Sequence, residues 1–356
     1  MTATGRSGQA AKPVELSVVV PVYNEAGNIE PFLDRLLPVL RELVQSYEVI
    51  FAADPSKDGT EELVRKARAA DDAVKLIVFS RRFGQPTATL AGVEFASGRA
   101  VVVIDVDLQD PPELMREMVS KWREGFEVVY AKRRSRRGET WIKRTVSNIG
   151  YRVINRFSEV EIPRDTGDYR LMDRRVVDQL LRFPETHGFL RGMVALVGFR
   201  QVAVEYERDA RLSGRGNYNR FFGSLKIGLN GLIAFSTALL SLSTMIGFIA
   251  AAASFILGTA YLVAQIVGTP FPVGNATIVA LILFVGGVQL MCLGLVGEYI
   301  GRIYDEVKRR PLFLVAERRG FEAAAAASHG GERPSVRDAV VVEHRRIEPT
   351  PAVGAR

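Results

Sequence analysis

The chain has 356 residues, a formal net charge of +7 and 47% hydrophobic residues, and its mean hydropathy of +0.08 lies above that of a typical water-soluble enzyme. The apolar residues are concentrated in one region, because residues 227–297 contain no Asp, Glu, Lys or Arg, whereas the sequence before them has the mixed composition of a globular domain. This distribution excludes both a purely soluble protein and a polytopic transporter.

Residues 1–14 contain no apolar segment typical of a signal peptide, so we expect a flexible N-terminus without a cleavable secretion signal. After them, short apolar runs alternate with segments of helical spacing. The predicted strands are residues 16–22, 47–53, 74–79, 99–105 and 126–131, and the predicted helices are residues 28–44, 60–70, 86–96 and 111–123. The strands are apolar throughout, as in a parallel sheet covered on both faces. This alternation predicts a doubly wound α/β domain over residues 15–218. In such a domain, ligands bind beyond the carboxyl ends of the strands.

Residues 140–158 carry apolar side chains on one helical side and basic side chains elsewhere. This pattern fits two alternatives, a helix packed on its own domain or a basic amphipathic helix lying on the membrane surface. Residues 219–237 have a similar pattern and lead into the apolar region, so we expect an amphipathic interfacial segment there.

The uncharged region is long enough for two membrane crossings, because one crossing needs about 20 residues. Residues 269–275, which contain Pro and Gly, separate two predicted transmembrane helices near 238–266 and 277–300, and together they predict a hairpin over 238–304. Basic residues flank both outer ends and are absent from the connecting loop, so the positive-inside rule places the α/β domain and both termini in the cytoplasm. The alternative is a hairpin buried in a soluble core.

Glycines in the second predicted span, among them Gly286 and Gly294, permit close helix approach, and we expect a homo-oligomer. After Pro311 the sequence becomes rich in Ala, Gly, Glu, Arg and Pro and predicts a disordered end. Residues 305–356 are therefore expected to form a cytoplasmic tail, largely disordered after about residue 320.

Two carboxylates follow the predicted strand that ends at residue 105: Asp105 and Asp107, with the amide of Gln109 close behind. A buried strand would deliver them to the carboxyl edge of the sheet, and this all-oxygen set suits Mg²⁺ or Mn²⁺. The alternative for an isolated motif of this kind is a solvated turn, and Asp110 could be a plain N-cap of the next helix. The position at the end of a strand favours the metal site.

Several segments occur in the order seen in one known family: Pro-Val-Tyr-Asn-Glu at 21–25, Asp-Val-Asp-Leu-Gln-Asp-Pro-Pro-Glu at 105–113, Thr-Gly-Asp-Tyr-Arg-Leu at 166–171, Phe-Leu-Arg-Gly at 189–192 and Val-Gly-Phe at 197–199. They resemble family 2 glycosyltransferases, and more narrowly the polyprenyl-phosphate glycosyltransferases, the group of the dolichyl-phosphate mannose synthases and bactoprenol glucosyltransferases. The resemblance runs from about residue 16 to residue 310. It implies a GT-A (Rossmann-like) fold, a nucleotide-sugar donor, a lipid phosphate acceptor and inversion at the anomeric carbon.

This resemblance gives the acidic motif a role. A divalent ion would stabilise the departing pyrophosphate as a Lewis acid, and Asp107 and Gln109 are the expected ligands, with Asp105 orienting the site or the ribose. The acceptor phosphate is already ionised at neutral pH, so no strong general base is needed. Positioning and charge neutralisation should then dominate the catalysis.

Asp168 resembles the family's acidic residue beside the reacting centre, and Arg170 would face the same side of an extended segment. The alternatives are a turn aspartate and a surface arginine. The expected catalytic residues are therefore Asp168, Arg170 and Asp107. Arginine suits phosphate recognition because its planar fork binds two oxygens, and the expected acceptor-phosphate residues are Arg133, Arg170, Arg208, Arg211 and Arg215. The alternative is that these basic clusters only attract anionic lipid headgroups.

For the donor, the resemblance points to residues that follow the first four strands. These are Pro21, Tyr23, Glu25, Asp54, Arg81 and Asp105. One position departs from the family pattern, because Ala53 stands where an aspartate usually accepts a hydrogen bond from the ring N–H of the base. The choice between uracil and guanine therefore stays open.

The predicted function is transfer of a hexose, preferably glucose from UDP-glucose, to a polyprenyl phosphate at the cytoplasmic face of the plasma or inner membrane. The alternatives are a mannosyltransferase that uses GDP-mannose, and a non-catalytic membrane scaffold with a degenerate transferase domain. A processive polysaccharide synthase usually carries a Gln-x-x-Arg-Trp motif and more spans, and the sequence has neither. The expected partners are the nucleotide sugar, the polyprenyl phosphate and the bilayer, and no nucleic acid.

Overall fold

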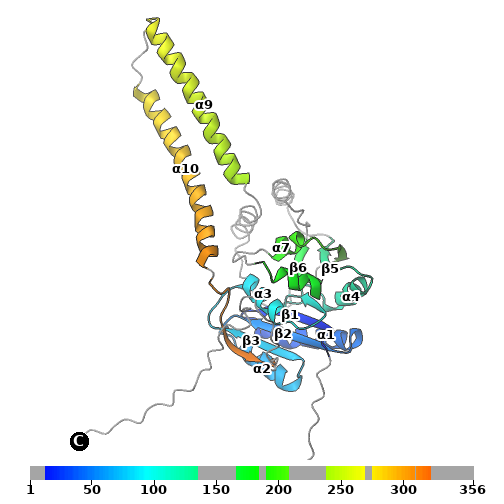
Figure 1. Cartoon of the computed structure of the whole chain (residues 1–356). Helices are drawn as coiled ribbons and strands as arrows, with labels where there is room; N and C mark the ends of the chain where they lie inside the picture. Colours follow the sequence, from blue (N-terminus) through cyan, green and yellow to red (C-terminus); the bar gives the residue numbers. More distant parts are fainter. Residues whose placement is uncertain are drawn as a thin grey trace, which may run out of the picture.

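The computed structural model describes residues 13–134, 166–183, 190–207, 238–268, 275–308 and 310–321. The predicted interfacial segments at 140–158 and 219–237 lie outside the described residues, as does the sequence after residue 321. The described residues form a mixed α/β domain and two long helices that extend away from it (Figure 1).

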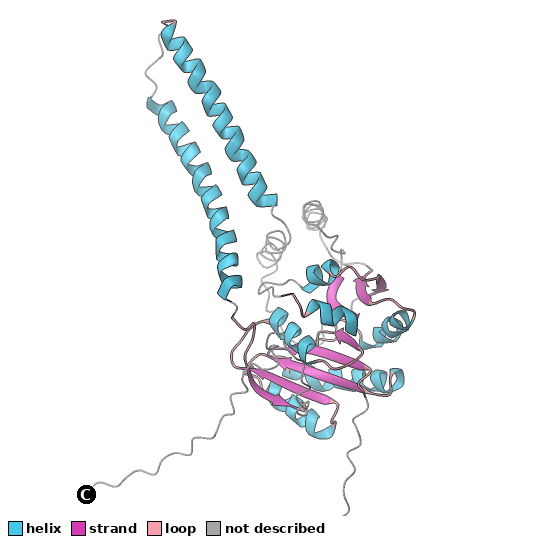
Figure 2. Ribbon diagram, in the orientation of Figure 1, coloured by secondary structure: helices cyan, strands magenta, loops and turns pink. Residues whose placement is uncertain are grey.

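The domain is built on an eight-stranded sheet with the strand order β7-β5-β6-β4-β1-β2-β3-β8. The strands are β1 (Leu16–Val22), β2 (Tyr47–Ala53), β3 (Val74–Phe79), β4 (Ala100–Val103), β5 (Val128–Arg133), β6 (Thr166–Asp173), β7 (Gln201–Tyr206) and β8 (Val315–Arg319). Strands β4, β1, β2 and β3 are parallel neighbours, so their carboxyl ends share one edge. Figure 2 shows the sheet with helices packed around it.

Helices cover both faces of the sheet, as the apolar strands predict. They are α1 (Ala26–Leu43), α2 (Thr60–Ala70), α3 (Gln85–Phe95), the short 3-10 helix η1 (Pro112–Leu114), α4 (Met115–Arg123), α6 (Arg174–Leu180) and α7 (Leu190–Leu196). Successive strand residues point to opposite faces, so Val18 and Val20 pack in one cluster with α1, whereas Val19 packs in the other with α3.

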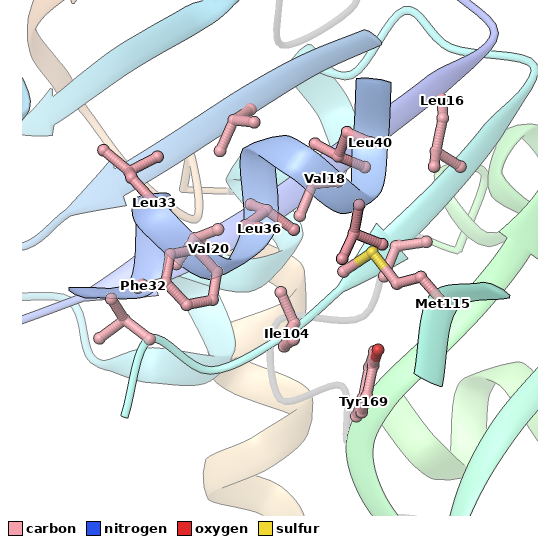
Figure 3. Close-up of a cluster of buried hydrophobic side chains, with 14 of the residues drawn as sticks. Leu16, Val18, Val20, Phe32, Leu33, Leu36, Leu40, Ile104, Met115 and Tyr169 are labelled. Carbon is pink, nitrogen blue, oxygen red and sulfur yellow. The ribbon is translucent and has the colours of Figure 1, made fainter. Parts of the chain in front are cut away.

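The α1 face of the core explains why that helix forms where it does. Phe32, Leu36 and Leu40 recur at helical spacing, and all three are fully buried. They lie over Val18 and Val20 of β1 (Figure 3). Burying such side chains stabilises the fold by about 1.5–3 kcal/mol each. The helix ends at Leu43, because Val44 already has extended dihedral angles.

The sheet is mixed, so the parallel arrangement suggested by the apolar strands holds for only part of it. Strand β6 pairs antiparallel with both β4 and β5, and β8 pairs antiparallel with β3. The apolar strand sequences could not distinguish these arrangements, because a strand covered on both faces is apolar whatever the direction of its neighbours.

Residues 310–321 return to the sheet after the last helix, and the predicted tail is wrong for this segment. Phe313 is only 2% exposed, and β8 pairs with the edge strand β3. The sequence of β8, Val-Ala-Glu-Arg-Arg, carries three charged residues because one side of this edge strand faces solvent. The composition therefore resembled that of a disordered end.

The two long helices are α9 (Ala238–Ile266) and α10 (Asn275–Lys308), which run antiparallel beside each other (Figure 1). Among the described residues, one segment, Phe284–Lys308 of α10, is long and apolar enough to cross a membrane by length and composition. Large apolar side chains on both helices are exposed, including Phe248 and Phe284. This exposure is incompatible with the alternative of a hairpin buried in a soluble core.

Candidate active site

The loops that follow β1, β2, β3 and β4 meet at one edge of the sheet, because these strands are parallel neighbours. In an open α/β sheet this edge is where ligands bind. Pro21 is buried within β1, opposite Ala52, and Tyr23 and Glu25 follow the end of that strand. The predicted donor residues that follow the other strands therefore start from the same edge.

The loops after β1 and β2 are joined by hydrogen bonds. The backbone amide of Asn24 donates to Ser56 Oγ at 3.1 Å, and the amide of Glu25 donates to Thr60 Oγ1 at 3.0 Å. Burial alone would raise the pKa of Asp58, but hydrogen bonds from Thr60 and from the backbone amide of Ala26 outweigh it and lower that pKa. Asp58 is therefore ionised at neutral pH and holds the start of α1.

Asp54 joins the second loop to the third. Its side chain is buried, and its two oxygens accept hydrogen bonds from the backbone amides of Phe83 at 2.8 Å and Gly84 at 2.9 Å. These contacts hold the loop between β3 and α3, which we call the donor loop and define as residues 80–84. Asp54, expected to bind the donor, thus also positions other residues of that edge. Its neighbour Ala53 is fully buried within β2 and contributes no polar side chain.

Two arginines of the donor loop lie over aromatic rings. The guanidinium of Arg82 is 4.0 Å from the ring centroid of Tyr23, and that of Arg81 is 4.2 Å from the ring centroid of Phe83. Such cation–π contacts contribute about 0.5–2 kcal/mol. The Arg82 contact connects the loop after β1 with the loop after β3, so Tyr23 and Arg81 belong to one connected surface.

The acidic residues after β4 lie in a tight turn. Asp107 is only 5% exposed, and its Oδ1 accepts a hydrogen bond from the backbone amide of Gln109 at 3.1 Å. Leu108 between them has a φ of 57°, in the left-handed region. Asp105 accepts a hydrogen bond from Gln85 Nε2 at 2.8 Å, which connects it to the start of α3. The solvated-turn alternative is wrong for Asp107, because its side chain is buried.

The described residues contain no group of three or more His, Cys, Asp or Glu side chains that could hold a metal ion by themselves. Asp105, Asp107 and Gln109 supply two carboxylates and an amide within one turn. This chemistry fits Mg²⁺ or Mn²⁺ if other oxygen ligands come from phosphates and water, as is usual for Mg²⁺. The residues present therefore fit a cation that is shared with a substrate.

Asp110 contacts β7 and does not cap the following helix. Its carboxylate accepts a short hydrogen bond from the hydroxyl of Tyr206, and it lies 4.0 Å from Arg133 Nη2. Arg133 Nε in turn donates to the Tyr206 hydroxyl at 3.2 Å. Burial, with the nearby Asp110 carboxylate, raises the pKa of Tyr206 to about 12. The N-cap alternative is wrong, because the helical segment begins after Pro111 without a side-chain cap.

Asp168 and Arg170 lie in the interior strand β6, so the alternatives of a turn aspartate and a surface arginine are both wrong. Asp168 Oδ1 accepts a hydrogen bond from Arg191 Nε at 2.8 Å. Arg170 is 3% exposed, its Nη2 donates to the Gly167 carbonyl at 3.1 Å, and its buried Nε has no hydrogen-bond partner. A buried unsatisfied donor of this kind is costly.

The charge of Asp168 is set by the arginines around it. Burial alone would raise the pKa of Asp168, but Arg191, Arg170 and Arg133 outweigh it and lower that pKa. Burial lowers the pKa of Arg170 to about 10, which still leaves it protonated at neutral pH. The arrangement thus holds one ionised carboxylate among arginines, next to the backbone of Gly167, where an added Cβ would lie 3.2 Å from Arg133 Nη2.

Some residues of this edge were not predicted, and others cannot be placed. Arg191 lies in the quoted segment 189–192, which was a signal without an assigned role. Gln85 departs from the family pattern in its segment, but its contact with Asp105 was not predicted, and nothing in the sequence pointed to the contact of Tyr206. The predicted acceptor residues outside the described part of the chain are Arg208, Arg211 and Arg215.

Comparison with known proteins identifies the family. Residues 17–181 match Glycosyl transferase family 2, and residues 245–303 match the GtrB C-terminal hairpin. An uncharacterised glycosyltransferase of Synechocystis sp. is 44% identical over 310 residues, which cover 87% of this chain and 97% of the relative. The bactoprenol glucosyl transferase of Shigella phage SfII is 38% identical over 303 residues, which cover 85% of this chain and 97% of the relative.

Among solved structures, the glucosyl-3-phosphoglycerate synthase of Mycobacterium tuberculosis, in complex with Mn²⁺, UDP and phosphoglyceric acid, gives a TM-score of 0.45 at 20% identity and covers 62% of this chain and 78% of that one. The sequence relatives match over nearly their whole length, and two separate regions of the chain match described families. The chain therefore belongs to glycosyl transferase family 2, with a GT-A-like α/β domain followed by a GtrB C-terminal hairpin.

Proposed function

We propose that the chain transfers a hexose from a nucleotide sugar to a polyprenyl phosphate, with UDP-glucose and glucose as the preferred donor and sugar. The observation that carries this proposal is the pair of acidic groups around one edge of the sheet, Asp107 after β4 and Asp168 in β6, with the buried Arg170 close to the latter. Relatives named bactoprenol glucosyl transferase, at 37–38% identity, support the choice of substrates.

On the donor side, the proposed binding residues are Pro21, Tyr23, Glu25, Asp54, Arg81 and Asp105. Asp54 acts by holding the donor loop through the amides of Phe83 and Gly84. Arg81 and Arg82 add positive charge at this edge, which favours a diphosphate. Because Ala53 offers no carboxylate to the base, GDP-mannose is the second candidate donor.

Asp107 and Gln109, with Asp105, would hold the divalent cation. When bound, Mg²⁺ or Mn²⁺ would neutralise charge on the departing diphosphate. The tight turn at Leu108 brings the Asp107 side chain and the Gln109 backbone together before any ligand arrives, so little reorganisation is needed. Preorganisation of this kind is a major source of catalysis.

In the transfer step, an oxygen of the acceptor phosphate forms a bond to the anomeric carbon while the bond from that carbon to the diphosphate oxygen breaks. Attack from the opposite face inverts the anomeric configuration. The acceptor phosphate is already ionised, so Asp168 has no proton to remove; we assign it to orienting the reacting groups and Arg170 to the acceptor phosphate. Arg133, Arg208, Arg211 and Arg215 complete the proposed acceptor set.

For the membrane, we propose that α9 and α10 both cross the bilayer and that the α/β domain lies on the cytoplasmic side. Between Ala238 and Gly297 neither helix contains a charged residue, whereas Glu298, Arg302 and Lys308 follow at the end of α10 nearest the domain. The proposed domains are residues 15–218, 219–237 and 238–304, with residues 310–321 now added to the first. A homo-oligomer is proposed from the glycines of α10.

The test is transfer of radiolabelled sugar to lipid in membranes that contain the full chain. We expect label in the lipid phase from UDP-glucose with undecaprenyl phosphate and Mg²⁺, and loss of that label with EDTA. A panel of UDP- and GDP-sugars identifies the donor. Membranes that show neither sugar transfer nor metal-dependent binding of a nucleotide sugar would instead support the scaffold alternative.

A further inference from the structure

The chain makes direct contact with the donor loop after it leaves α10. We call residues 310–321 the return strap. Its strand β8 pairs with β3, with Glu317 opposite Val78 and Val315 opposite Phe79. Just beyond this register, the backbone amide of Ser80 donates to the carbonyl of Leu314 at 2.9 Å. The strap is therefore attached where β3 ends and the donor loop begins.

A row of aromatic rings continues from the strap into the loop. Phe313 is 2% exposed and packs edge to face on Phe79, with ring centroids 5.7 Å apart. Phe79 packs edge to face on Phe83, with centroids 5.9 Å apart. Aromatic pairs of this geometry contribute about 0.5–1.5 kcal/mol beyond their burial. Phe313 therefore supports Phe83 through one intermediate ring.

The loop is fixed between this row of rings and Asp54. The amides of Phe83 and Gly84 donate to the two oxygens of Asp54, and the next residue, Gln85, donates to Asp105. A shift of Phe83 would therefore disturb both hydrogen bonds to Asp54. It would also move Gln85 and so disturb the hydrogen bond that Gln85 donates to Asp105. Misplacement by about 1 Å is enough to reduce the efficiency of a binding site strongly.

We propose that Phe313 is a positioning residue for the nucleotide-sugar site, and that the return strap fixes the donor loop in the conformation that binds the donor. This inference rests on the proposed function. Its consequence is that the donor site reaches full affinity only when the chain has returned from α10 to the sheet. The membrane hairpin and the donor site are then connected by a continuous set of contacts.

The competing explanation is that the strap only covers an otherwise open sheet edge. The strap itself provides a matched control for this explanation. Phe321 packs on Phe95, with centroids 5.4 Å apart, at the far end of α3 from the donor loop. Phe313 also packs on Phe95, with centroids 6.3 Å apart, but it is Phe313 that packs on Phe79 and so leads to Phe83. Phe321→Ala removes the same side-chain atoms from the same strap as Phe313→Ala, so the two variants separate edge covering from loop positioning.

The experiment uses the full chain in lipid nanodiscs, with wild type, Phe313→Ala, Phe313→Leu and Phe321→Ala. Amide hydrogen exchange of residues 81–85 reports the loop, and KM values for donor and for polyprenyl phosphate report the two substrates. We expect Phe313→Ala to lose protection at Phe83 and Gly84 and to raise the donor KM about tenfold, with the acceptor KM unchanged. Phe321→Ala should keep both values of the wild type.

Phe313→Leu preserves most of the volume, so it should fold even if the alanine variant does not, and we expect it to raise the donor KM about threefold. Unchanged exchange of the loop in the Phe313 variants, or equal effects of Phe321→Ala, would overturn the role of the strap. A wild-type chain that binds neither UDP- nor GDP-sugars would overturn the proposed function as well, and this outcome is recognised separately because the exchange measurement needs no substrate.

Discussion

Asp168 illustrates how neighbouring charges decide the state of a single carboxyl group. It lies in the interior of the sheet, where burial favours the neutral acid, yet Arg191 donates to it at 2.8 Å and Arg170 and Arg133 lie nearby. The arginines outweigh the burial and keep the pKa of Asp168 below its ordinary value. A carboxylate that stays ionised can orient charged groups over the whole physiological pH range.

Replacing Arg191 with Gln should raise the pKa of Asp168. The wild-type carboxylate loses its charge only as the pH falls through its lowered pKa, so the variant should lose it at higher pH. The acid limb of the kcat profile should move up by about 1 pH unit, because an adjacent opposite charge shifts a carboxyl by about 1–3 units. Arg182→Gln, at an exposed site, is the control. An unmoved acid limb would show that Arg191 does not set the charge of Asp168.

Asp107→Asn tests the proposed cation site. The amide keeps the shape of the side chain but removes the charge that would hold Mg²⁺ or Mn²⁺, so sugar transfer should fall by about 100-fold or more. Membrane insertion should be unchanged, and Asp34→Asn, on the exposed side of α1, should keep wild-type activity. Transfer assays over a range of Mg²⁺ concentrations check this, and near-normal activity would remove Asp107 from the cation site.

At the residue scale, the sequence predicted positions better than contacts. Asp105 and Asp107 could be placed at the ligand edge because they directly follow a buried strand. The contacts of Arg191 with Asp168 and of Tyr206 with Asp110 could not be predicted, because each joins two different elements, whose residues are 23 and 96 positions apart in the chain. Only the folded sheet brings such side chains together.

At the scale of elements, the donor loop depends on one glycine. Gly84 has a φ of 92° and precedes α3, and its amide donates to Asp54. Residues other than glycine rarely adopt this backbone conformation, and forcing alanine into it costs about 1–3 kcal/mol. The nearest atom to an added Cβ, leaving out the two neighbouring residues, is Cδ of Pro86 at 4.0 Å, so the cost is one of backbone conformation alone.

Gly84→Ala should therefore weaken donor binding by moving the loop. Gly125→Ala is a matched control, since Gly125 has a φ of 97° after α4 and lies outside the candidate site. Both variants should lower the free energy of unfolding by about 1–3 kcal/mol, measured by thermal unfolding of the full chain. Only Gly84→Ala should also raise the donor KM, and an equal rise in Gly125→Ala would mean that stability rather than loop position determines donor binding.

The elements with strong periodicity were predicted well, and the exceptions have a physical cause. The predicted helix at 60–70 and strand at 74–79 coincide with α2 and β3, because apolar spacing determines both. Strand β8 was missed because an edge strand needs few apolar residues, and the antiparallel direction of β6 was missed because direction depends on the connection rather than on composition.

At the scale of the whole molecule, the length of α10 limits how far the α/β domain can lie from the membrane. Its uncharged part, residues 275–297, is about 34 Å long, enough for the roughly 30 Å of bilayer hydrocarbon. The charged part that follows, to Lys308, adds about 16 Å. Phe313 is already buried in the domain, so the connecting residues span at most about 18 Å. In the proposed arrangement, in which α10 crosses the bilayer, the domain is tied close to the headgroups.

This geometry predicts the orientation of the hairpin. In a Cys292→Ser background, which removes the natural cysteine, Asn275→Cys and Lys308→Cys place single thiols at the two ends of α10. With the domain in the cytoplasm, as the basic residues at the domain end predict, a membrane-impermeant maleimide should label position 275 in intact cells and position 308 only after permeabilisation.

The Cys292→Ser chain without an added cysteine should remain unlabelled and sets the background of this experiment. The result distinguishes two spans from one. A crossing by α10 alone does not fit the sheet, because β8 follows α10 and pairs with β3, which precedes α9, so the paired strands would lie on opposite sides of the membrane. A third thiol at Ala238→Cys, at the domain end of α9, decides between them: it should behave like position 308 if both helices cross. Labelling of positions 275 and 238 alike in intact cells would contradict the two-span hairpin.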